Sequence, residues 1–255
     1  MLKSALFAAA FAALAAPAQA QTVAALVGDD MLAHVDAKTW KVTKTVKISG
    51  LPARVAGIDV RPADGMLYAL AEDGTVATLD PSSGKASVKS KLETMLGKGV
   101  AASVDFNPVA DRLRVIGADG TSLRANVDDG KVATDGKLRF KEGDANAGKT
   151  AMIVAAAYTN AVKGAKETNL YDIDASGIYA RQAPPNDGIL NTLAAGMAAP
   201  MVAFDIVADA SGANVGWAVV GKTVHSLDPA TGKMTKLGDI AGLTGAARDI
   251  AILPN

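Results

Sequence analysis

Cysteine is absent from this chain of 255 residues, so no disulfide can stabilise the fold. The free energy of folding must therefore come from apolar burial and hydrogen bonding. Histidine is nearly absent as well, since His34 and His225 are the only two. Two histidines and no thiol are too few for a His-rich transition-metal site, a metallohydrolase site or a cysteine nucleophile.

An excess of either charge is also missing, because 26 basic residues balance 26 acidic ones. This balance argues against nucleic acid as a partner, because a protein that binds nucleic acid needs a basic surface. Aromatic residues are scarce at 4%, whereas Ala, Val and Gly are abundant, and such small side chains suit closely stacked sheets. No Pro-rich or Ser-rich linker divides the chain, which indicates a single domain over residues 21–255.

Residues 1–20 have the features of a secretory signal peptide. The segment MLKSALFAAAFAALAAPAQA carries Lys3 near its start, then an apolar stretch, then small residues before Gln21. Cleavage after Ala20 is expected, which places the mature protein in the periplasm or outside the cell. The apolar stretch is too short and too rich in Ala for a stable transmembrane helix, and no membrane span is expected in the mature chain.

One pattern recurs at a spacing of roughly 45 residues, the length of a four-stranded propeller blade. Each copy starts with a short apolar strand, continues through a hairpin with an Asp-Gly or similar turn, and ends in an Asx-led turn closed by Gly. The predicted innermost strands are residues 57–62, 103–108, 155–160, 203–208 and 248–253. The sequence thus predicts an all-β fold, a five-bladed β-propeller.

The two ends of the chain complement each other in this pattern. Residues 23–49 contain three strands without an innermost one, and residues 248–253 supply an innermost strand without its blade. Joined, the two segments complete the fifth blade and leave no open edge in the ring. Six blades are the alternative, if residues 131–150 form further strands.

The third copy departs from the pattern in two places. Ala157 stands where the other inner strands have a central Asp, and residues 161–167 are an insertion between the first two strands. A polar, Gly-rich loop at 141–149 precedes this copy. Loops on a rigid scaffold often carry function, although a solvated connection is the simpler interpretation of 141–149.

Several segments resemble a family of bacterial exported proteins grouped as domain of unknown function 4394. The segments are GIDVRPADGMLYAL (57–70), VDFNPVADRLRVIGADGTSLRANVDDG (104–130), AAAYTN (155–160), NLYDID (169–174) and RQAPPNDG (181–188). The resemblance covers nearly the whole mature chain. It implies an exported, propeller-like fold, and it transfers no activity and no catalytic residue.

The central aspartates of the inner strands are candidate metal ligands: Asp59, Asp105, Asp205 and Asp249. Inner strands line the channel of a propeller, so these carboxylates can face one another and raise each other's pKa values. A bound Ca²⁺ or Mg²⁺ would relieve the repulsion. In the structural alternative, each Asp accepts hydrogen bonds from backbone N–H groups or pairs with an arginine of a neighbouring blade.

A second group of polar residues is concentrated in the second and third copies. Its members are Asp105, Asn107, Arg112, Arg114, Arg124 and Arg181. Forked guanidinium donors of this kind can bind a carboxylate, a phosphate or a sugar. The structural alternative is a salt-bridge network between blades, because repeat-equivalent positions suit a packing role.

These observations favour a non-enzymatic binding or interaction module whose ligand is a protein, a glycan or a small anion. One alternative is a hydrolase or lyase that uses the channel aspartates, with or without a divalent cation. Glycoside hydrolysis would need a pair of carboxyl groups, and no Glu occurs on a predicted inner strand. The other alternative is a structural envelope protein.

Overall fold

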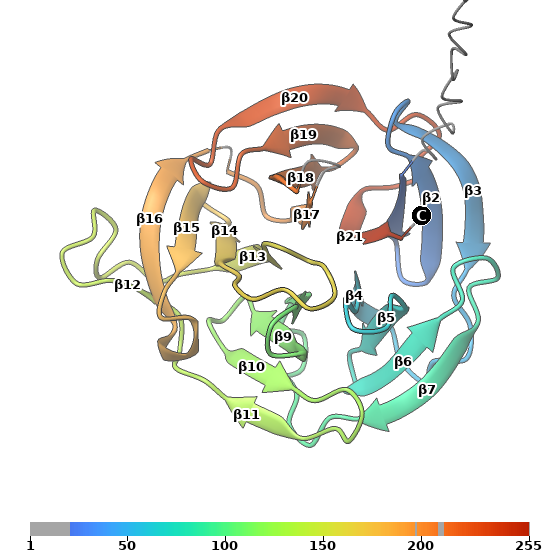
Figure 1. The fold of residues 1–255 in the computed structure, drawn as a ribbon, viewed down its shortest axis with the longest axis horizontal. Helices are drawn as coiled ribbons and strands as arrows, with labels where there is room; N and C mark the ends of the chain where they lie inside the picture. The colour runs from blue at the N-terminus through green and yellow to red at the C-terminus, as the bar shows by residue number, and fades with distance from the viewer. Residues whose placement is uncertain (1–20, 197, 209–211, 255) are drawn as a thin grey trace, which may run out of the picture.

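The computed structural model describes residues 21–196, 198–208 and 212–254, which form five β-sheets arranged in a ring. Figure 1 looks down the axis of this ring, with one strand of each sheet near the centre and the outermost strands at the rim. The predicted signal peptide, residues 1–20, lies outside the described residues. No helix among the described residues has the length and hydropathy of a membrane span.

Four blades follow one another along the chain, each running from an inner strand outward. Blade 1 consists of β4 (Val55–Val60), β5 (Leu67–Ala71), β6 (Thr75–Leu79) and β7 (Ala86–Lys91). Blade 2 consists of β8 (Ala102–Asn107), β9 (Arg112–Gly117), β10 (Ser122–Ala125) and β11 (Val132–Thr134). Blade 3 consists of β13 (Ile153–Tyr158), β14 (Leu170–Asp174), β15 (Ile178–Gln182) and β16 (Ile189–Ala195). Blade 4 consists of β17 (Ala203–Ala208), β18 (Asn214–Val220), β19 (Thr223–Leu227) and β20 (Met234–Asp239).

Blade 5 is closed by both ends of the chain, as the sequence predicts. It combines β21 (Ala247–Leu253) with β1 (Thr22–Val27), β2 (Met31–Asp36) and β3 (Lys41–Lys47). The strands β21 and β1 pair antiparallel, with Thr22 opposite Leu253 and Leu26 opposite Asp249. This pairing joins the last strand to the first, so the two ends of the chain close the ring in one sheet.

The six-bladed alternative is wrong, because residues 131–150 form no additional blade. They contain β11 and the two-residue strand β12 (Arg139–Phe140), which pairs in parallel with the outer strand β16 of blade 3. A single turn of 3-10 helix, η1 (Pro185–Asp187), connects β15 to β16. Residues 131–150 therefore bridge blades 2 and 3 at the rim of the ring.

The turns between strands have the chemistry expected from the sequence. Gly74, Gly120 and Gly177 adopt φ values of 85°, 84° and 88°, which only glycine reaches without strain. In the next turn of blade 1, Asp80 Oδ1 accepts a hydrogen bond from the backbone N–H of Ser82, and Asp228 does the same for Ala230 in blade 4. These side chains stabilise the connection to each outer strand.

Apolar side chains fill each of the five interfaces between neighbouring blades. Small residues such as Ala24, Ala77 and Ala157 are fully buried there, which explains how the sheets stack closely with few aromatic residues. The inner strands β4, β8, β13, β17 and β21 are neighbours around the axis. All five end at the same opening of the channel, which we call the C-terminal mouth.

Candidate functional site

Three of the four predicted channel aspartates come together near the axis of the ring. Asp59 of β4, Asp105 of β8 and Asp205 of β17 each offer a carboxylate oxygen, and these oxygens lie within 4.8 Å of one another. All three side chains are buried, with exposed fractions of 7%, 4% and 6%. The five-fold repeat of inner strands thus builds a layer of carboxyl groups across the channel.

Each carboxyl group of this layer links its own strand to the next one around the ring. Asp59 Oδ2 accepts the backbone N–H of Phe106 (2.6 Å), and Asp105 Oδ1 accepts that of Tyr158 (3.1 Å). Asp205 Oδ2 accepts the N–H of Ile252 in the same way (3.0 Å). These bonds satisfy donors that the inner strands, with no further strand on the channel side, would otherwise leave unpaired.

Asp249 lies one layer deeper, away from the C-terminal mouth. Its Oδ2 accepts the N–H of Ile58, the residue after Gly57, whereas Asp205 binds the N–H that follows Ala251. The hydrogen bonds therefore align Ala251, and not Asp249, with Asp205 in the carboxyl layer. The sequence-based placement of Asp249 as the central residue of 248–253 is therefore two residues out of register.

Gly57 leaves the space that Asp249 occupies. A methyl group on Gly57 would lie 2.6 Å from Cγ2 of Val104 and 2.8 Å from Oδ2 of Asp249. Gly57→Ala is therefore expected to destabilise the fold by about 1–3 kcal/mol, the usual cost of overpacking a filled interior. Urea denaturation measures this change. The control is Gly97→Ala, where the methyl group would meet nothing closer than Val100 at 3.5 Å, and equal midpoints for the two variants would contradict the close approach.

Arginine pairing, one of the two structural alternatives for the channel aspartates, is not seen among the described residues. None of the salt bridges in the described part of the chain reaches Asp59, Asp105 or Asp205. Arg61 follows β4 and instead binds Asp111 and Asp128 of blade 2. Of the two structural alternatives, backbone N–H groups therefore hold the carboxyl groups and arginine does not.

Burial without a cationic partner raises the pKa of every carboxyl group in the layer. Desolvation and the nearby charge of Asp205 hold the pKa of Asp59 well above its usual value, and desolvation and Asp59 do the same for Asp105. Burial raises the pKa of Asp205 to about 7, although the two backbone donors oppose the shift. The layer therefore holds protons at a pH where exposed aspartates are fully ionised.

The polar residues of the second candidate group do not form one site. Arg114 is 1% exposed and binds Asp135, Ser122 and Asn186, and its partner Asp135 also binds Arg124. This network joins blades 2 and 3, which is the arrangement of the structural alternative. Sequence reasoning missed Asp135 and Asn186, because both lie in connections outside the regular repeat.

The other members of this group are scattered. Asn107 Oδ1 accepts the N–H groups of Val109 and Ala110 in the turn after β8. Arg112 binds the carbonyl oxygens of Ala110 and Asp111 in that same turn. Arg181 is exposed on β15 of blade 3. Of the six residues, only Asp105 belongs to the channel layer.

A pocket of about 280 Å³ lies at the C-terminal mouth, and we call it the central pocket. Asp59 and Asp205 line this pocket. Each lies deeper in the channel than the residues that follow it at the end of its strand, so the two carboxyl groups form the floor of the pocket. Its walls come from Val60, Pro62 and Gly65, from residues 161–163, 206–207 and 252–254, and from Gln21. The insertion in the third copy is therefore part of the pocket wall, and in Figure 1 the loop between β13 and β14 crosses the front of the ring near its axis.

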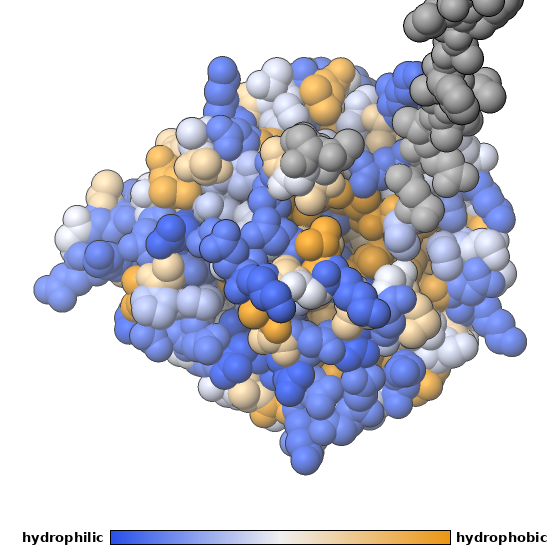
Figure 2. Space-filling view, in the orientation of Figure 1, coloured by the Kyte–Doolittle hydropathy of each residue, from blue (hydrophilic) through white to orange (hydrophobic). Residues whose placement is uncertain are grey.

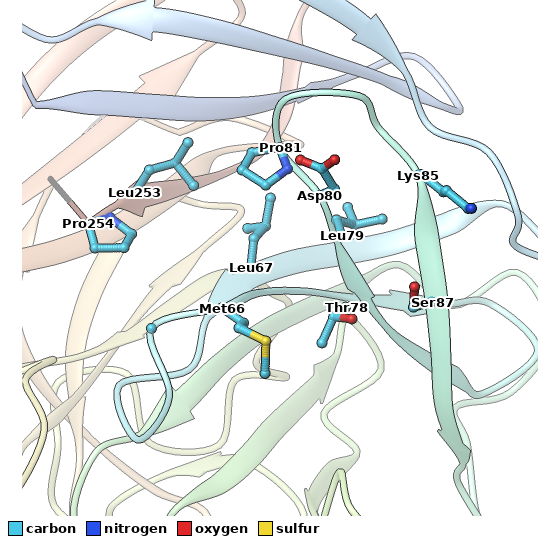
Figure 3. A pocket seen from close by; sticks show the side chains of 11 residues that line it. Met66, Leu67, Thr78, Leu79, Asp80, Pro81, Lys85, Ser87, Leu253 and Pro254 are labelled. Atoms are coloured by element: carbon cyan, nitrogen blue, oxygen red, sulfur yellow. The ribbon is translucent and has the colours of Figure 1, made fainter.

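A larger groove of about 600 Å³ adjoins the central pocket, and we call it the side groove. The two share Gly65, Leu253 and Pro254, so they are continuous across the end of β21. Figure 3 shows Leu253 and Pro254 at the left of the groove, with Leu67 and Met66 next to them. On the other side, Thr78, Asp80, Lys85 and Ser87 of blade 1 supply polar groups.

Exposed apolar side chains also gather at the C-terminal mouth. Met66, Val109 and Val162 lie in the three connections that follow β4, β8 and β13, and they are 42%, 47% and 48% exposed. Figure 2 shows this face, with apolar atoms at depth in a hollow beside the axis and polar atoms around it. A face with a pocket and exposed apolar groups has the properties of a binding surface.

Comparisons with known proteins place the fold and leave the chemistry open. A family model described as a domain of unknown function, DUF4394, matches residues 31–251. A crystal structure of a protein of unknown function from Bacteroides thetaiotaomicron VPI-5482 is similar with a TM-score of 0.54 and 12% identity, over 86% of this chain and 56% of that chain. Another, from Bacteroides caccae, has a TM-score of 0.48 and 13% identity, over 86% and 73%. No curated protein matches the sequence.

Proposed function

The chain belongs to the DUF4394 family, and we propose that it is an exported, non-enzymatic binding protein that holds its ligand at the C-terminal mouth. The central pocket carries this proposal, because it combines buried carboxyl groups with an opening into the larger side groove. Ligand sites are usually concave and largely apolar, with a few polar groups that fix orientation. The sequence of residues 1–20 supports export.

The dimensions of the two cavities suit an organic ligand. Small-molecule sites commonly measure about 300–1,000 Å³, and the central pocket and side groove have about 280 and 600 Å³. Their shared wall at Leu253 and Pro254 lets one elongated ligand, such as a flexible chain, occupy both. The rigid ring of blades holds this wall in place, so little ordering is needed on binding.

A small anion suits this mouth less well than the other expected ligand classes. The carboxyl groups of Asp59 and Asp205 would repel it once they ionise. A basic pocket of about 270 Å³ exists elsewhere, lined by Arg112, Arg124 and Lys131 among others. However, Arg124 already binds Asp135 through two hydrogen bonds, which neutralises most of its charge there.

Filling the central pocket tests the proposal. Ala161 is an exposed residue of the pocket wall, and Ala161→Trp places a large side chain at the opening. The probes are n-hexylamine, n-hexanol, hexanoate, glucose and a neutral hexapeptide, each measured by the change in melting temperature. At a hundredfold excess over Kd, a ligand adds about 2.7 kcal/mol of stability, which is several degrees. At least one probe is expected to stabilise the unmodified protein but not Ala161→Trp.

The control is the same substitution in an exposed loop that does not line the pocket. Ala145 lies in the polar loop at 141–149, and Ala145→Trp should respond to every probe as the unmodified protein does. If no probe distinguishes Ala161→Trp from Ala145→Trp, the C-terminal mouth is not the binding site. That result would leave the structural envelope protein as the better description.

A further inference from the structure

The carboxyl layer at the floor of the central pocket has only backbone donors as partners. Five of the six carboxylate oxygens of the layer accept a backbone N–H group, from Val60, Phe106, Tyr158, Ile206 and Ile252. Backbone donors stabilise a carboxylate but carry no full positive charge. When these three groups ionise, no positive charge among the described residues offsets the repulsion between oxygens that lie within 4.8 Å of one another.

The sixth oxygen points to what is missing from the layer. Asp105 is 4% exposed, and its Oδ1 accepts the N–H of Tyr158, but no donor in the described part of the chain reaches its Oδ2. A carboxylate oxygen of Asp105 lies within 4.8 Å of one from Asp59 and one from Asp205, and these two residues line the pocket. This oxygen is able to accept a hydrogen bond, so a ligand that brings an N–H group there gains affinity.

The space above the carboxyl groups is apolar. Val60, Val162, Val207 and Leu253 are among the residues of the pocket wall. Lys163 also lines the pocket and is an exposed residue. A ligand that fits these surroundings has a charged donor at one end and a hydrocarbon part next to it.

A divalent cation fits the same place less well. Ca²⁺ requires about 6–8 oxygen ligands at close range, whereas five of the six carboxylate oxygens here already accept backbone hydrogen bonds. The pocket of about 280 Å³ also has room for many more atoms than a single ion. A primary ammonium group has three N–H donors and fits this geometry, because it needs only one or two carboxylate oxygens as acceptors.

We infer that the central pocket binds an organic cation, a primary ammonium group on an apolar chain, with the ammonium against Asp59, Asp105 and Asp205. The chain of the ligand passes Leu253 and Pro254 toward the side groove. Binding supplies the donor that Asp105 Oδ2 lacks and reduces the repulsion within the layer. This inference rests on the proposed binding function, and it adds the chemical class of the ligand.

Isothermal titration calorimetry with three probes of similar shape tests the inference. The probes are n-hexylamine, n-hexanol and hexanoate, which differ mainly in charge, and Ca²⁺ and Mg²⁺ are titrated separately. We expect n-hexylamine to bind at least about tenfold more tightly than the other two organic probes, the size of one charge-assisted hydrogen bond. This comparison uses the unmodified protein and needs no variant to fold.

Asp105→Asn provides the site-specific arm of the experiment. Only one oxygen of Asp105 accepts a hydrogen bond, so Asn can keep that bond while it removes the negative charge. The variant is expected to bind n-hexylamine at least about tenfold more weakly. The matched control is Asp172→Asn, which removes an equally buried carboxyl group that lies outside the pocket and has no hydrogen-bond partner.

Each contrary outcome has a distinct meaning. If n-hexanol or hexanoate binds as tightly as n-hexylamine, the ammonium inference is wrong although the pocket remains a binding site. If Ca²⁺ or Mg²⁺ binds and Asp105→Asn abolishes that binding, the layer is a metal site and the inference is overturned. If none of these probes binds, the ammonium inference is wrong, and the proposed function fails as well if glucose and the neutral hexapeptide also leave the melting temperature unchanged.

Discussion

Lowering the pH from about 8 to about 5 is expected to raise the melting temperature of this protein, the reverse of the trend for proteins whose carboxylates are paired with cations. The cause is the set of buried carboxyl groups without cationic partners. Burial raises the pKa of Asp172 to about 8, that of Asp249 to about 8 and that of Asp205 to about 7. The pKa values of Asp59 and Asp105 are also raised well above the ordinary value.

The sign follows from proton binding in the two states. In the unfolded chain these groups have pKa values near 3.8, so at a pH between about 4 and 8 the folded protein binds protons that the unfolded chain has released. The stability from these groups is complete below about pH 4 and is lost as the pH rises through 7 and 8. Each unit of pKa shift corresponds to about 1.4 kcal/mol, so the groups together change the free energy of unfolding by several kcal/mol.

Other aspartates limit the stability of the protein at acid pH. Hydrogen bonds from Ser83 and Ser82 lower the pKa of Asp80 to about 2, and similar turn contacts lower the pKa values of Asp36 and Asp228. The stability from these groups is present above the ordinary pKa of 3.8 and is lost only as the pH falls below it. The melting temperature should therefore have its maximum near pH 4 to 5, roughly where the two trends cross.

Differential scanning calorimetry across the pH range measures this curve, and Asp172→Asn isolates one contribution to it. Both carboxyl oxygens of Asp172 are buried without a partner, and the side chain is 0% exposed. The variant should be more stable than the unmodified protein at pH 8 and should show a smaller rise toward pH 5. A melting temperature that is flat or falls between pH 8 and pH 5 would show that the buried carboxyl groups ionise freely.

Most of the fold could be predicted from the sequence because a propeller is a local repeat. Each blade is built from strands that are consecutive in the chain, so the spacing of strands and turns indicates the blade directly. Blade 5 is the exception, and it was still predictable because 23–49 and 248–253 are complementary fragments of the same pattern. The choice between five and six blades depended on 131–150, whose polar sequence resolves into only two short strands.

The site was less predictable because it depends on contacts between repeats. The convergence of Asp59, Asp105 and Asp205 followed from their equivalent places on inner strands. The deeper position of Asp249 could not be predicted in this way. The segment RDIAIL (248–253) has only one Asp, and the spacing alone does not reveal that Ala251 takes the equivalent position. The walls of the central pocket come from segments that are far apart in the sequence and irregular in conformation, and no periodic signal marks such segments.

Arg114→Met is expected to lower the free energy of unfolding by about 3–5 kcal/mol, because it leaves the buried charge of Asp135 poorly compensated. Arg114 is the largest side chain that is almost completely buried, at 1% exposure, and the side chain of Asp135 is 4% exposed. Arg114 also donates to Ser122 Oγ, Tyr158 Oη and Asn186 Oδ1, so its loss leaves several buried acceptors without a donor. The melting temperature should fall by roughly 10 °C.

The matched control is Arg112→Met, two residues earlier on the same strand, β9. Arg112 binds only carbonyl oxygens of its own turn, so its replacement should change stability by less than about 1 kcal/mol. In the double variant Arg114→Met, Asp135→Asn, part of the lost stability should return, because the charge left without its main partner is removed as well. Equal stabilities for Arg114→Met and Arg112→Met would show that the network between blades 2 and 3 adds nothing to the fold, and Arg114 would then be free for the ligand-binding role that the sequence also suggested.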